Sequence, residues 1–460
     1  MGKKYHSTVS RRDFLKILGL GGLGLGASAV AAPVIHDMDE MIASPEADFK
    51  RPWYVKEVDR PTVEIDWKMM QRFDEHLVMW YAGLRNAWGP EGYDKIFKIQ
   101  QENRIKWIKE NRPGYTLRDD ALHNAAHWAP VSFLGPRTSE TPEQLGVPRW
   151  EGTPEENARM MRVMMRVYGA SQVGFVELDT NTTEKLIYEY DTPGYGQPQG
   201  PKIVFADVDE PSETQTERII PKKCRWAIVY GIRMSSLLFN YSPSNMGQIS
   251  TYYAYNLKTL FQGQVQNFLR TLGYIGVGEA SPYNALGSHV GLGIMAGMGE
   301  MSRTMHLMTP EYGLHQRVFM LITDLPLAPG KPIDFGVMNF CRACKKCADS
   351  CPVNAIPHDT EPDWQKRGPY QVDGVRTWYR NEPVCNAYMH QTAGCALCIA
   401  VCPLSKGNRQ AFYHDIMRAT ISTTPVLNRF FRNMDDFLGY GIKGDPEVFW
   451  NLDPPPFAWY

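Results

Sequence analysis

Hydrophobic and polar positions along the chain predict helices interleaved with short strands. Residues 153–156, Thr-Pro-Glu-Glu, place an N-cap threonine, a proline at the first helical position and a glutamate at the third. This capping box predicts a helix that runs to about Tyr168. Residues 255–272 predict a second helix, which Gly273 is placed to end, and a strand is expected directly after it.

Three further segments have the β-branched and aromatic content of short strands: Val173–Leu178, Lys202–Ala206 and Trp226–Ile232. Residues 63–111 have a helical but poorly periodic pattern, and residues 134–152 form a connection rich in proline and glycine. The last residues, 419–460, are expected to return over the core as extended chain. Helices interleaved with strands, followed by a cysteine-rich region, indicate an α/β core and then a ferredoxin-like module.

The composition is that of a large globular protein. The chain has 460 residues, 43% of them hydrophobic, which predicts two or more domains. Its formal net charge of −1 gives no electrostatic reason to bind nucleic acid. The aromatic content of 12% suits either an apolar pocket or an ordinary core.

Eight of the nine cysteines lie between Cys341 and Cys402, in two runs that each end in Cys-Pro. The first run has the bacterial ferredoxin spacing, in which the fourth cysteine binds the other of two clusters. A [4Fe–4S] cluster takes four thiolates, so eight cysteines match two clusters. The ferredoxin rule assigns a first set and a second set of ligands: Cys341, Cys344, Cys347 and Cys402; and Cys351, Cys385, Cys395 and Cys398.

Two other interpretations of these cysteines stay open. Cys-x-x-Cys pairs also hold zinc, and exported chains often form disulfides. Neither accounts for the repeated three-residue gap followed by proline. The ninth cysteine, Cys224, is expected to be a small buried hydrophobic residue. His289, His306 and His315 lack the paired spacing of a metal site, so we expect them to be structural or to lie at a cofactor's edge.

The amino terminus carries an export signal. Residues 10–16, Ser-Arg-Arg-Asp-Phe-Leu-Lys, form a twin-arginine motif, and an apolar stretch with an Ala-Val-Ala cleavage site at 29–31 follows it. We therefore expect residues 1–32 to be a signal peptide and the protein to lie at the outer face of the cytoplasmic membrane. Past the leader no run of 18 apolar residues occurs, so membrane attachment is expected through a partner.

Several short segments give the chain a resemblance to a known family. They are residues 296–303 (Ala-Gly-Met-Gly-Glu-Met-Ser-Arg), 309–313 (Thr-Pro-Glu-Tyr-Gly) and 323–327 (Thr-Asp-Leu-Pro-Leu). Placed in this order between the leader and the two cysteine runs, they resemble the respiratory reductive dehalogenases. The leader residues 5–10, Tyr-His-Ser-Thr-Val-Ser, are most similar to those of enzymes that act on chlorinated ethenes.

The resemblance implies a nitroreductase-like core that holds a corrinoid, with one cluster close beside it. The corrinoid is expected to bind base-off, because the chain lacks the Asp-x-His-x-x-Gly signature of a lower histidine ligand. Gly291, Gly297, Gly299 and Glu300 are the implied cofactor contacts, although a tightly packed turn would explain the glycines equally well. The implied domains are the leader (1–32), a region covering the core (33–152), the corrinoid-binding core (153–330), the two-cluster module (331–410) and a segment packed on the core (411–460).

The resemblance also implies a proton donor. Tyr255 stands where the family places its tyrosine, and Arg317 where its basic partner falls. Asn284 is a further candidate near the tyrosine, with an ordinary turn asparagine as the alternative. Because an adjacent guanidinium favours the phenolate, we expect Arg317 to lower the pKa of Tyr255 below about 10. Trp378 and Tyr388 are candidates for the wall of the substrate cavity, with core packing as the alternative.

The implied reaction replaces a carbon–halogen bond by carbon–hydrogen with two electrons and one proton, as the terminal step of organohalide respiration. An organohalide would be the substrate, and a membrane-anchor protein and an electron-donating respiratory complex the partners. Two other functions stay open, an epoxyqueuosine-reductase-like corrinoid enzyme and a non-catalytic iron–sulfur electron-transfer subunit. The leader and the lack of basic excess argue against the first. A protein with iron but no cobalt would favour the second.

Overall fold

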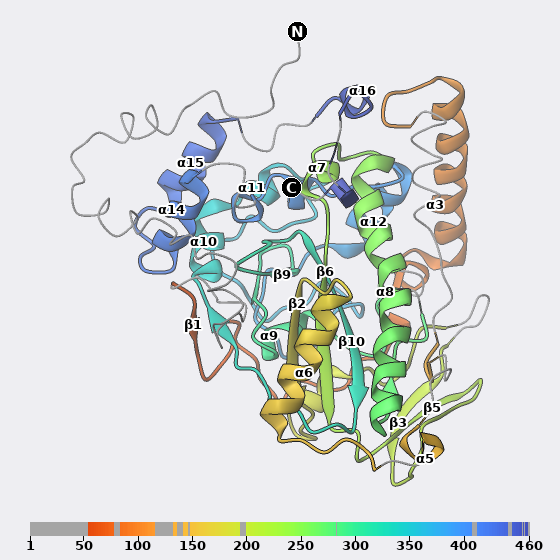
Figure 1. The fold of residues 1–460 in the computed structure, drawn as a ribbon. Helices are drawn as coiled ribbons and strands as arrows, with labels where there is room; N and C mark the ends of the chain where they lie inside the picture. The colour runs from red at the N-terminus through yellow and green to blue at the C-terminus, as the bar shows by residue number, and fades with distance from the viewer. Residues whose placement is uncertain are drawn as a thin grey trace.

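The computed structural model describes residues 54–77, 83–115, 132–135, 141–145, 148–193, 199–281, 283–406, 412–439, 444–452, 454 and 456–458. The expected signal peptide lies outside these residues. A four-stranded antiparallel sheet with the order β2-β6-β10-β7 forms the centre (Figure 1). Its strands are β2 (Gln172–Glu177), β6 (Trp226–Arg233), β10 (Gln316–Thr323) and β7 (Gly276–Val277).

Helices cover both faces of this sheet. Helices α6 (Pro154–Val167) and α8 (Asn245–Leu272) lie in front of it in the view of Figure 1 and share one core cluster with it. Helix α9 (His289–Met295) packs in a second cluster. Phe319 of β10 belongs to the first cluster and Met320 to the second, because successive residues of a strand point to opposite faces. By the same period, Arg317 shares the face of α8.

The predicted helix signals are confirmed. Thr153 caps α6 by accepting a hydrogen bond from the Glu156 backbone, and the Glu156 carboxylate accepts one from the Thr153 backbone in return. Helix α8 ends at Gly273, which has a left-handed φ of 89°. It begins ten residues earlier than predicted, at Asn245. The polar residues of its first turns are buried there, and tertiary packing holds them in a helix that their weak propensity did not indicate.

The predicted strands are confirmed as β2, β3 (Lys202–Ala206) and β6. Strand β3 pairs in parallel with β5 (Glu217–Pro221), which pairs with β4 (Ser212–Glu213) in a small separate sheet. The other short elements are η1 (Glu75–Leu77), α5 (Pro142–Leu145), η3 (Thr183–Leu186), α7 (Ser236–Phe239), β8 (Glu300–Met301), β9 (Leu307–Met308) and η5 (Pro456–Ala458).

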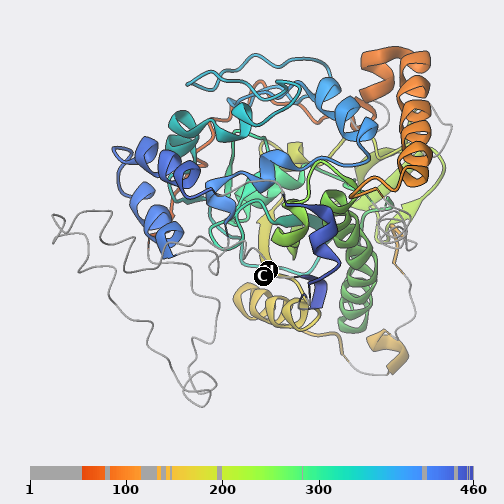
Figure 2. The same ribbon diagram turned by 90° about the horizontal axis from the view of Figure 1, so that it is seen from above.

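Short helices carry or flank the cysteines. They are α10 (Val337–Cys344), α11 (Lys346–Asp349), α12 (Glu382–Gln391), α13 (Leu397–Ala400) and η4 (Pro403–Ser405). Helix α3 (Leu84–Lys109) packs on α12, and Figure 2 shows it at the edge of the molecule. Strand β1 (Lys56–Glu57) pairs with β11 (Ile333–Asp334). These N-terminal elements therefore contact the region that precedes and contains the cysteines.

Two expectations about local structure are wrong. Only part of 63–111 is helical, and Gly89 with a φ of 70°, followed by Pro90, interrupts α3 near its start. The chain end is not extended but forms α14 (Phe412–Ile421), α15 (Asn428–Phe437) and α16 (Pro446–Phe449). Helix α15 buries Phe431 and Met434 in the cluster that contains α10. Among the described residues, no helix combines the length and the apolar character needed to cross a membrane.

Candidate active site and cluster-binding module

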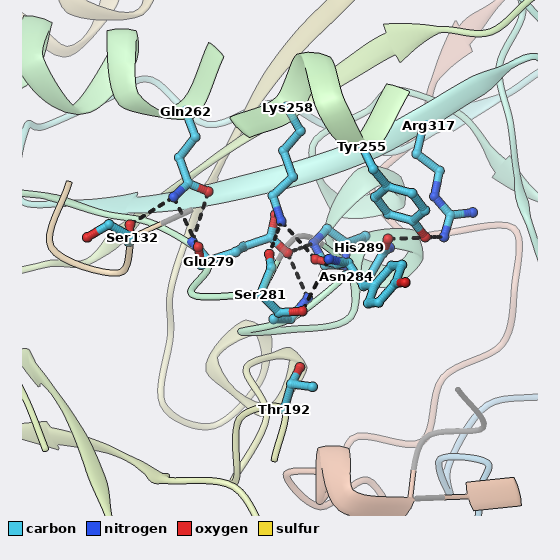
Figure 3. Close-up of polar contacts among 12 residues, drawn as sticks. Ser132, Thr192, Tyr255, Lys258, Gln262, Glu279, Ser281, Asn284, His289 and Arg317 are labelled. Atoms are coloured by element: carbon cyan, nitrogen blue, oxygen red, sulfur yellow. Dashed lines mark hydrogen bonds and ion pairs between the residues drawn. The ribbon is translucent and has the colours of Figure 1, made fainter. Parts of the chain in front are cut away.

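One face of α8 carries a row of buried polar side chains. Tyr255, Lys258, Gln262 and Gln266 follow one another at intervals of three and four residues, so they share a helix face. The loop residues 278–281 and 283–285 lie across this row (Figure 3). Gln262 donates to the Glu279 carbonyl at 3.1 Å and accepts from the Glu279 backbone N–H at 3.0 Å. The helix thus fixes the loop through side-chain contacts to its backbone.

Lys258 strengthens this attachment with a fully buried ion pair. Its Nζ donates to the carbonyls of Ser281 and Tyr283, both at 2.7 Å, and lies 3.0 Å from Oε2 of Glu279. The other carboxylate oxygen, Oε1, lies 2.7 Å from Nε2 of His289. Burial would raise the pKa of Glu279, but Lys258 and His289 outweigh it and the pKa is lowered. Glu279 is therefore a carboxylate whose charge is balanced inside the protein.

The loop brings Asn284 to the two residues predicted for proton transfer. The Arg317 Nη2 donates to the phenolic oxygen of Tyr255 and, at 3.1 Å, to Oδ1 of Asn284. Figure 3 shows Tyr255 on α8 and Arg317 on β10 pointing toward each other. The structure thus brings together three residues that are far apart in sequence; their catalytic roles stay predictions.

The expected pKa of Tyr255 is wrong in direction. Burial raises the pKa of Tyr255 above its ordinary value of 10.0, and the charge and hydrogen bond of Arg317 oppose this without reversing it. The phenol is buried within the core, where forming an anion costs more than one neighbouring cation returns. Tyr255 therefore keeps its proton at neutral pH.

A cavity connects Arg317 to the cysteines. Its lining includes Arg317, His306 and Arg380 together with all four cysteines of the second set. The Nε atoms of Arg317 and Arg380 are buried and have no hydrogen-bond partner among the described residues. Unsatisfied buried donors of this kind are suited to a bound ligand. The second set of cysteines, rather than the first, borders the space in front of Arg317.

Thiols from the two runs lie close enough to act on one another, and their assignment to two ligand sets stays a prediction. The charges that act on Cys344 include those of Cys402 and Cys341, although Cys402 belongs to the other run. Likewise Cys351 of the first run acts on Cys385 and Cys395. All nine cysteines are free, so the disulfide interpretation finds no support. The described residues include no group of Cys, His, Asp or Glu close enough to hold a single metal ion.

The surroundings of the thiols fit clusters. Burial raises the pKa of Cys341 to about 12, because an isolated thiolate is poorly solvated in the interior. Burial raises the pKa of Cys344 and Cys395 as well. The backbone N–H of Lys346 stabilises the Cys344 thiolate and that of Leu397 the Cys395 thiolate, which opposes this rise in pKa. Iron would supply the remaining stabilisation by displacing the thiol protons.

The predicted corrinoid contacts receive packing roles from the structure. Gly297 has a φ of 72°, and a side chain there would collide with the Lys331 carbonyl; at Gly299 it would collide with the Met308 carbonyl, and at Gly291 with the Leu186 side chain. The Glu300 carboxylate is buried and accepts from the Thr62 hydroxyl at 2.6 Å and from the Phe335 and Val337 N–H groups. The tightly packed turn accounts for these positions, and their contact with a corrinoid stays a prediction.

The remaining candidates divide between cavity and core. Tyr388 and His306 line the cavity. Trp378 is buried and donates to the Asp359 carbonyl at 3.0 Å, so it belongs to the packed interior. Cys224 is buried as expected, and His315 stacks on Phe239 with ring centroids 5.4 Å apart.

Sequence reasoning missed Lys258, Glu279 and Arg303. The spacing of Lys258 and Gln262 from Tyr255 could have indicated a polar stripe on the buried face of α8. Glu279 lies in a loop without a recognisable motif. Arg303 stands at the end of the segment 296–303, but its sequence context gives it no role.

Known proteins share this combination of an α/β core and a two-cluster module. The family model of the reductive dehalogenase subunit matches residues 50–327, and that of a 4Fe-4S double cluster binding domain matches residues 340–405. The trichloroethene reductive dehalogenase of Dehalococcoides mccartyi is 30% identical, covering 99% of this chain and 98% of that protein. The tetrachloroethene reductive dehalogenase of Sulfurospirillum multivorans is 30% identical over 98% of this chain and 95% of that protein.

A solved structure described as suggesting a mechanism for B12-dependent dehalogenation by a reductive dehalogenase has the same fold, with a TM-score of 0.59 and 19% identity. The match covers 84% of this chain and 49% of that one, so this chain spans about half its length. An epoxyqueuosine reductase of Lactococcus garvieae matches over only 30% of this chain.

The fold and the cysteine module define an iron–sulfur oxidoreductase with an α/β core. The chain belongs to the reductive dehalogenase family. Its C-terminal region is a double [4Fe–4S] domain, and the predicted set of one corrinoid and two clusters agrees with these comparisons.

Proposed function

We propose that the protein is a terminal reductase that replaces a halogen of a chlorinated ethene by hydrogen, using a base-off corrinoid and two [4Fe–4S] clusters. The substrate class rests on two relatives, each similar over nearly the whole chain, whose names state activity on chlorinated ethenes. The corrinoid rests on the family and on a B12-dependent dehalogenation mechanism suggested for a protein of the same fold.

One observation carries the proposal: Arg317, which donates hydrogen bonds to Tyr255 and Asn284, lines a cavity that reaches the second set of cysteines. Electrons and a proton are needed close together, and the guanidinium that binds the Tyr255 phenol lies on the wall of a cavity that also reaches the second set of cysteines. The unpartnered Nε atoms of Arg317 and Arg380 leave donors available to a ligand there.

The overall reaction consumes two electrons and one proton, breaks the carbon–halogen bond, forms a carbon–hydrogen bond and releases halide. The corrinoid supplies the reducing centre for bond cleavage, and the clusters supply single electrons. Tyr255 holds a proton on its phenolic oxygen at neutral pH, because burial raises its pKa. When that proton leaves, the Arg317 guanidinium stabilises the phenolate, and Asn284 holds the guanidinium in orientation.

The location and partners are part of the same proposal. The twin-arginine motif and the Ala-Val-Ala site support export and removal of residues 1–32. The mature protein would act at the outer face of the cytoplasmic membrane, held there by a membrane-anchor protein and supplied by a respiratory electron donor.

Chloride release tests the proposed activity. Anaerobically purified protein reconstituted with corrinoid, iron and sulfide should release chloride from chlorinated ethenes when given a low-potential reductant, with the less chlorinated product appearing in equal amount. Chlorinated ethanes, propanes and aromatics in the same panel define the substrate class. A fully loaded protein that releases no chloride from any of them contradicts the proposal.

A further inference from the structure

Arg303 is a buried cation whose contacts are all with neutral groups. It is 1% exposed and follows β8, beside the first set of cysteines. Its Nε and Nη2 donate to the Cys341 carbonyl at 3.1 and 2.8 Å. Its Nη1 donates to the carbonyls of Pro357 and Asp359 at 2.7 and 2.8 Å. Its guanidinium carbon lies 4.2 Å from the centre of the Trp378 ring.

No carboxylate among the described residues lies within ion-pair distance of Arg303. The groups whose charge acts most strongly on it are the thiols of Cys341, Cys347 and Cys344, followed by the exposed carboxylate of Asp359. Burying a cation without an anion is strongly unfavourable. A cluster bound by four thiolates is negatively charged, so a cluster held by the first set would supply the counter-charge of Arg303.

The acidic groups nearest the first set are engaged elsewhere. Glu300, whose charge acts on Cys341, accepts hydrogen bonds from Thr62 and from two backbone N–H groups. Asp435, whose charge acts on Cys344, pairs with Lys346 and also accepts from Tyr413 and His414. Neither of these carboxylates contacts Arg303.

The second set also has a nearby arginine, Arg380, but this one forms an ion pair with a carboxylate. The charge of Arg380 acts on Cys385, Cys395 and Cys398, as that of Arg303 acts on the first set. Its Nη2, however, lies 3.3 Å from the Glu382 carboxylate, and both side chains are largely buried. The second set therefore faces an ion pair with little net charge, and the first set faces a full positive charge.

We propose that Arg303 sets the reduction potential of the first-set cluster above that of the second-set cluster. Reduction adds one electron, supplied by an external reductant, and makes the cluster more negative. A nearby uncompensated cation stabilises this reduced state, whereas the Arg380–Glu382 pair does so only weakly. The first electron taken up would rest on the first-set cluster, and the stronger reductant would be the cluster beside the cavity.

Redox titration of the full chain with both clusters, followed by electron paramagnetic resonance, tests this. Arg303→Met should favour the oxidised form of the first-set cluster. At a fixed potential, its oxidised-to-reduced ratio should rise at least tenfold, which equals a potential lowered by about 59 mV for one electron. Arg303→Lys, which keeps the charge, should shift it less. The second-set cluster should not change in either variant.

Glu382→Gln tests, without altering Arg303, whether an uncompensated arginine raises the reduction potential of the adjacent cluster. This variant remains a test of the proposal if Arg303→Met loses a cluster. It frees the charge of Arg380 and should shift the second-set cluster at least tenfold toward the reduced form while the first stays unchanged. Cys344→Ser and Cys398→Ser identify which signal belongs to which set. Equal shifts in the two Arg303 variants, or an unchanged potential in Glu382→Gln, would overturn the proposal. The proposal about the two reduction potentials concerns the clusters alone, so the protein could be a dehalogenase even if this proposal fails.

Discussion

Two regions of the molecule treat buried charge in different ways. Beneath the site, Lys258 and Glu279 form a buried ion pair, and His289 contacts the same carboxylate. Beside the first set of cysteines, Arg303 contacts carbonyls and a tryptophan ring and has no ion-pair partner among the described residues. Charges balanced by the chain itself serve to position a loop. A buried charge left without a partner marks where a group that the chain does not supply has to bind.

The largest effect should come from the Tyr255 phenol, which Arg317 contacts beside the balanced network. Tyr255→Phe keeps the ring but removes the proton, so chloride release should fall by about 100-fold or more. Cobalt and iron content should stay at the wild-type level. Tyr253→Phe is the control, since Tyr253 lies on the exposed side of α8 and should retain full activity. Wild-type rates in Tyr255→Phe would remove this residue from the mechanism.

Breaking the balanced charges should cost most in stability. Lys258→Met leaves the buried Glu279 without its main partner and should lower the free energy of unfolding by about 3–5 kcal/mol in denaturant titrations. Lys258→Met combined with Glu279→Gln should recover part of this loss, because no unpaired charge then remains. Lys223→Met, which breaks an exposed pair with Asp209, is the control with almost no effect. A double variant as unstable as the single one would contradict this view of the pair.

The module can be tested through its crossed ligands. Cys402→Ala should abolish the spectroscopic signal of the first-set cluster and leave the second, although Cys402 lies in the second run. Cys351→Ala should do the reverse. If each variant instead loses the cluster of its own run, the crossed assignment is wrong.

The smallest effect is expected at Glu300, where burial raises the pKa to about 7. Because this folded-state pKa exceeds the unfolded value of 4.5, the stabilisation is present below about pH 4.5 and is lost as the pH rises through about 7. Its size is on the order of 3 kcal/mol. The free energy of unfolding, measured from pH 5 to 8, should therefore depend less on pH in Glu300→Gln than in the wild type. Identical pH dependence in the two proteins would contradict the raised pKa.

The double-cluster domain could be predicted from the sequence because cluster ligation leaves a local spacing pattern of cysteines. The start of α6 and the end of α8 were predictable for the same reason, since Thr153, Glu156 and Gly273 act on their immediate neighbours. The start of α8 was not predictable, because distant packing holds its polar first turns in place.

The site was accessible only through resemblance. Tyr255 and Arg317 are 62 residues apart, and nothing in their local sequences joins them. Arg303 bonds to carbonyls 38 to 56 residues away, which no periodicity reveals. The pKa of Tyr255 was predicted with the wrong sign because a neighbouring arginine can be inferred from sequence, whereas the depth of burial cannot.

The ratio of cobalt to iron in anaerobically isolated protein tests the central claim most directly. A corrinoid-dependent reductive dehalogenase with two [4Fe–4S] clusters should contain about one cobalt for every eight irons. Eight irons with almost no cobalt, in protein that cannot be loaded with corrinoid, would contradict the account and leave an electron-transfer subunit in its place.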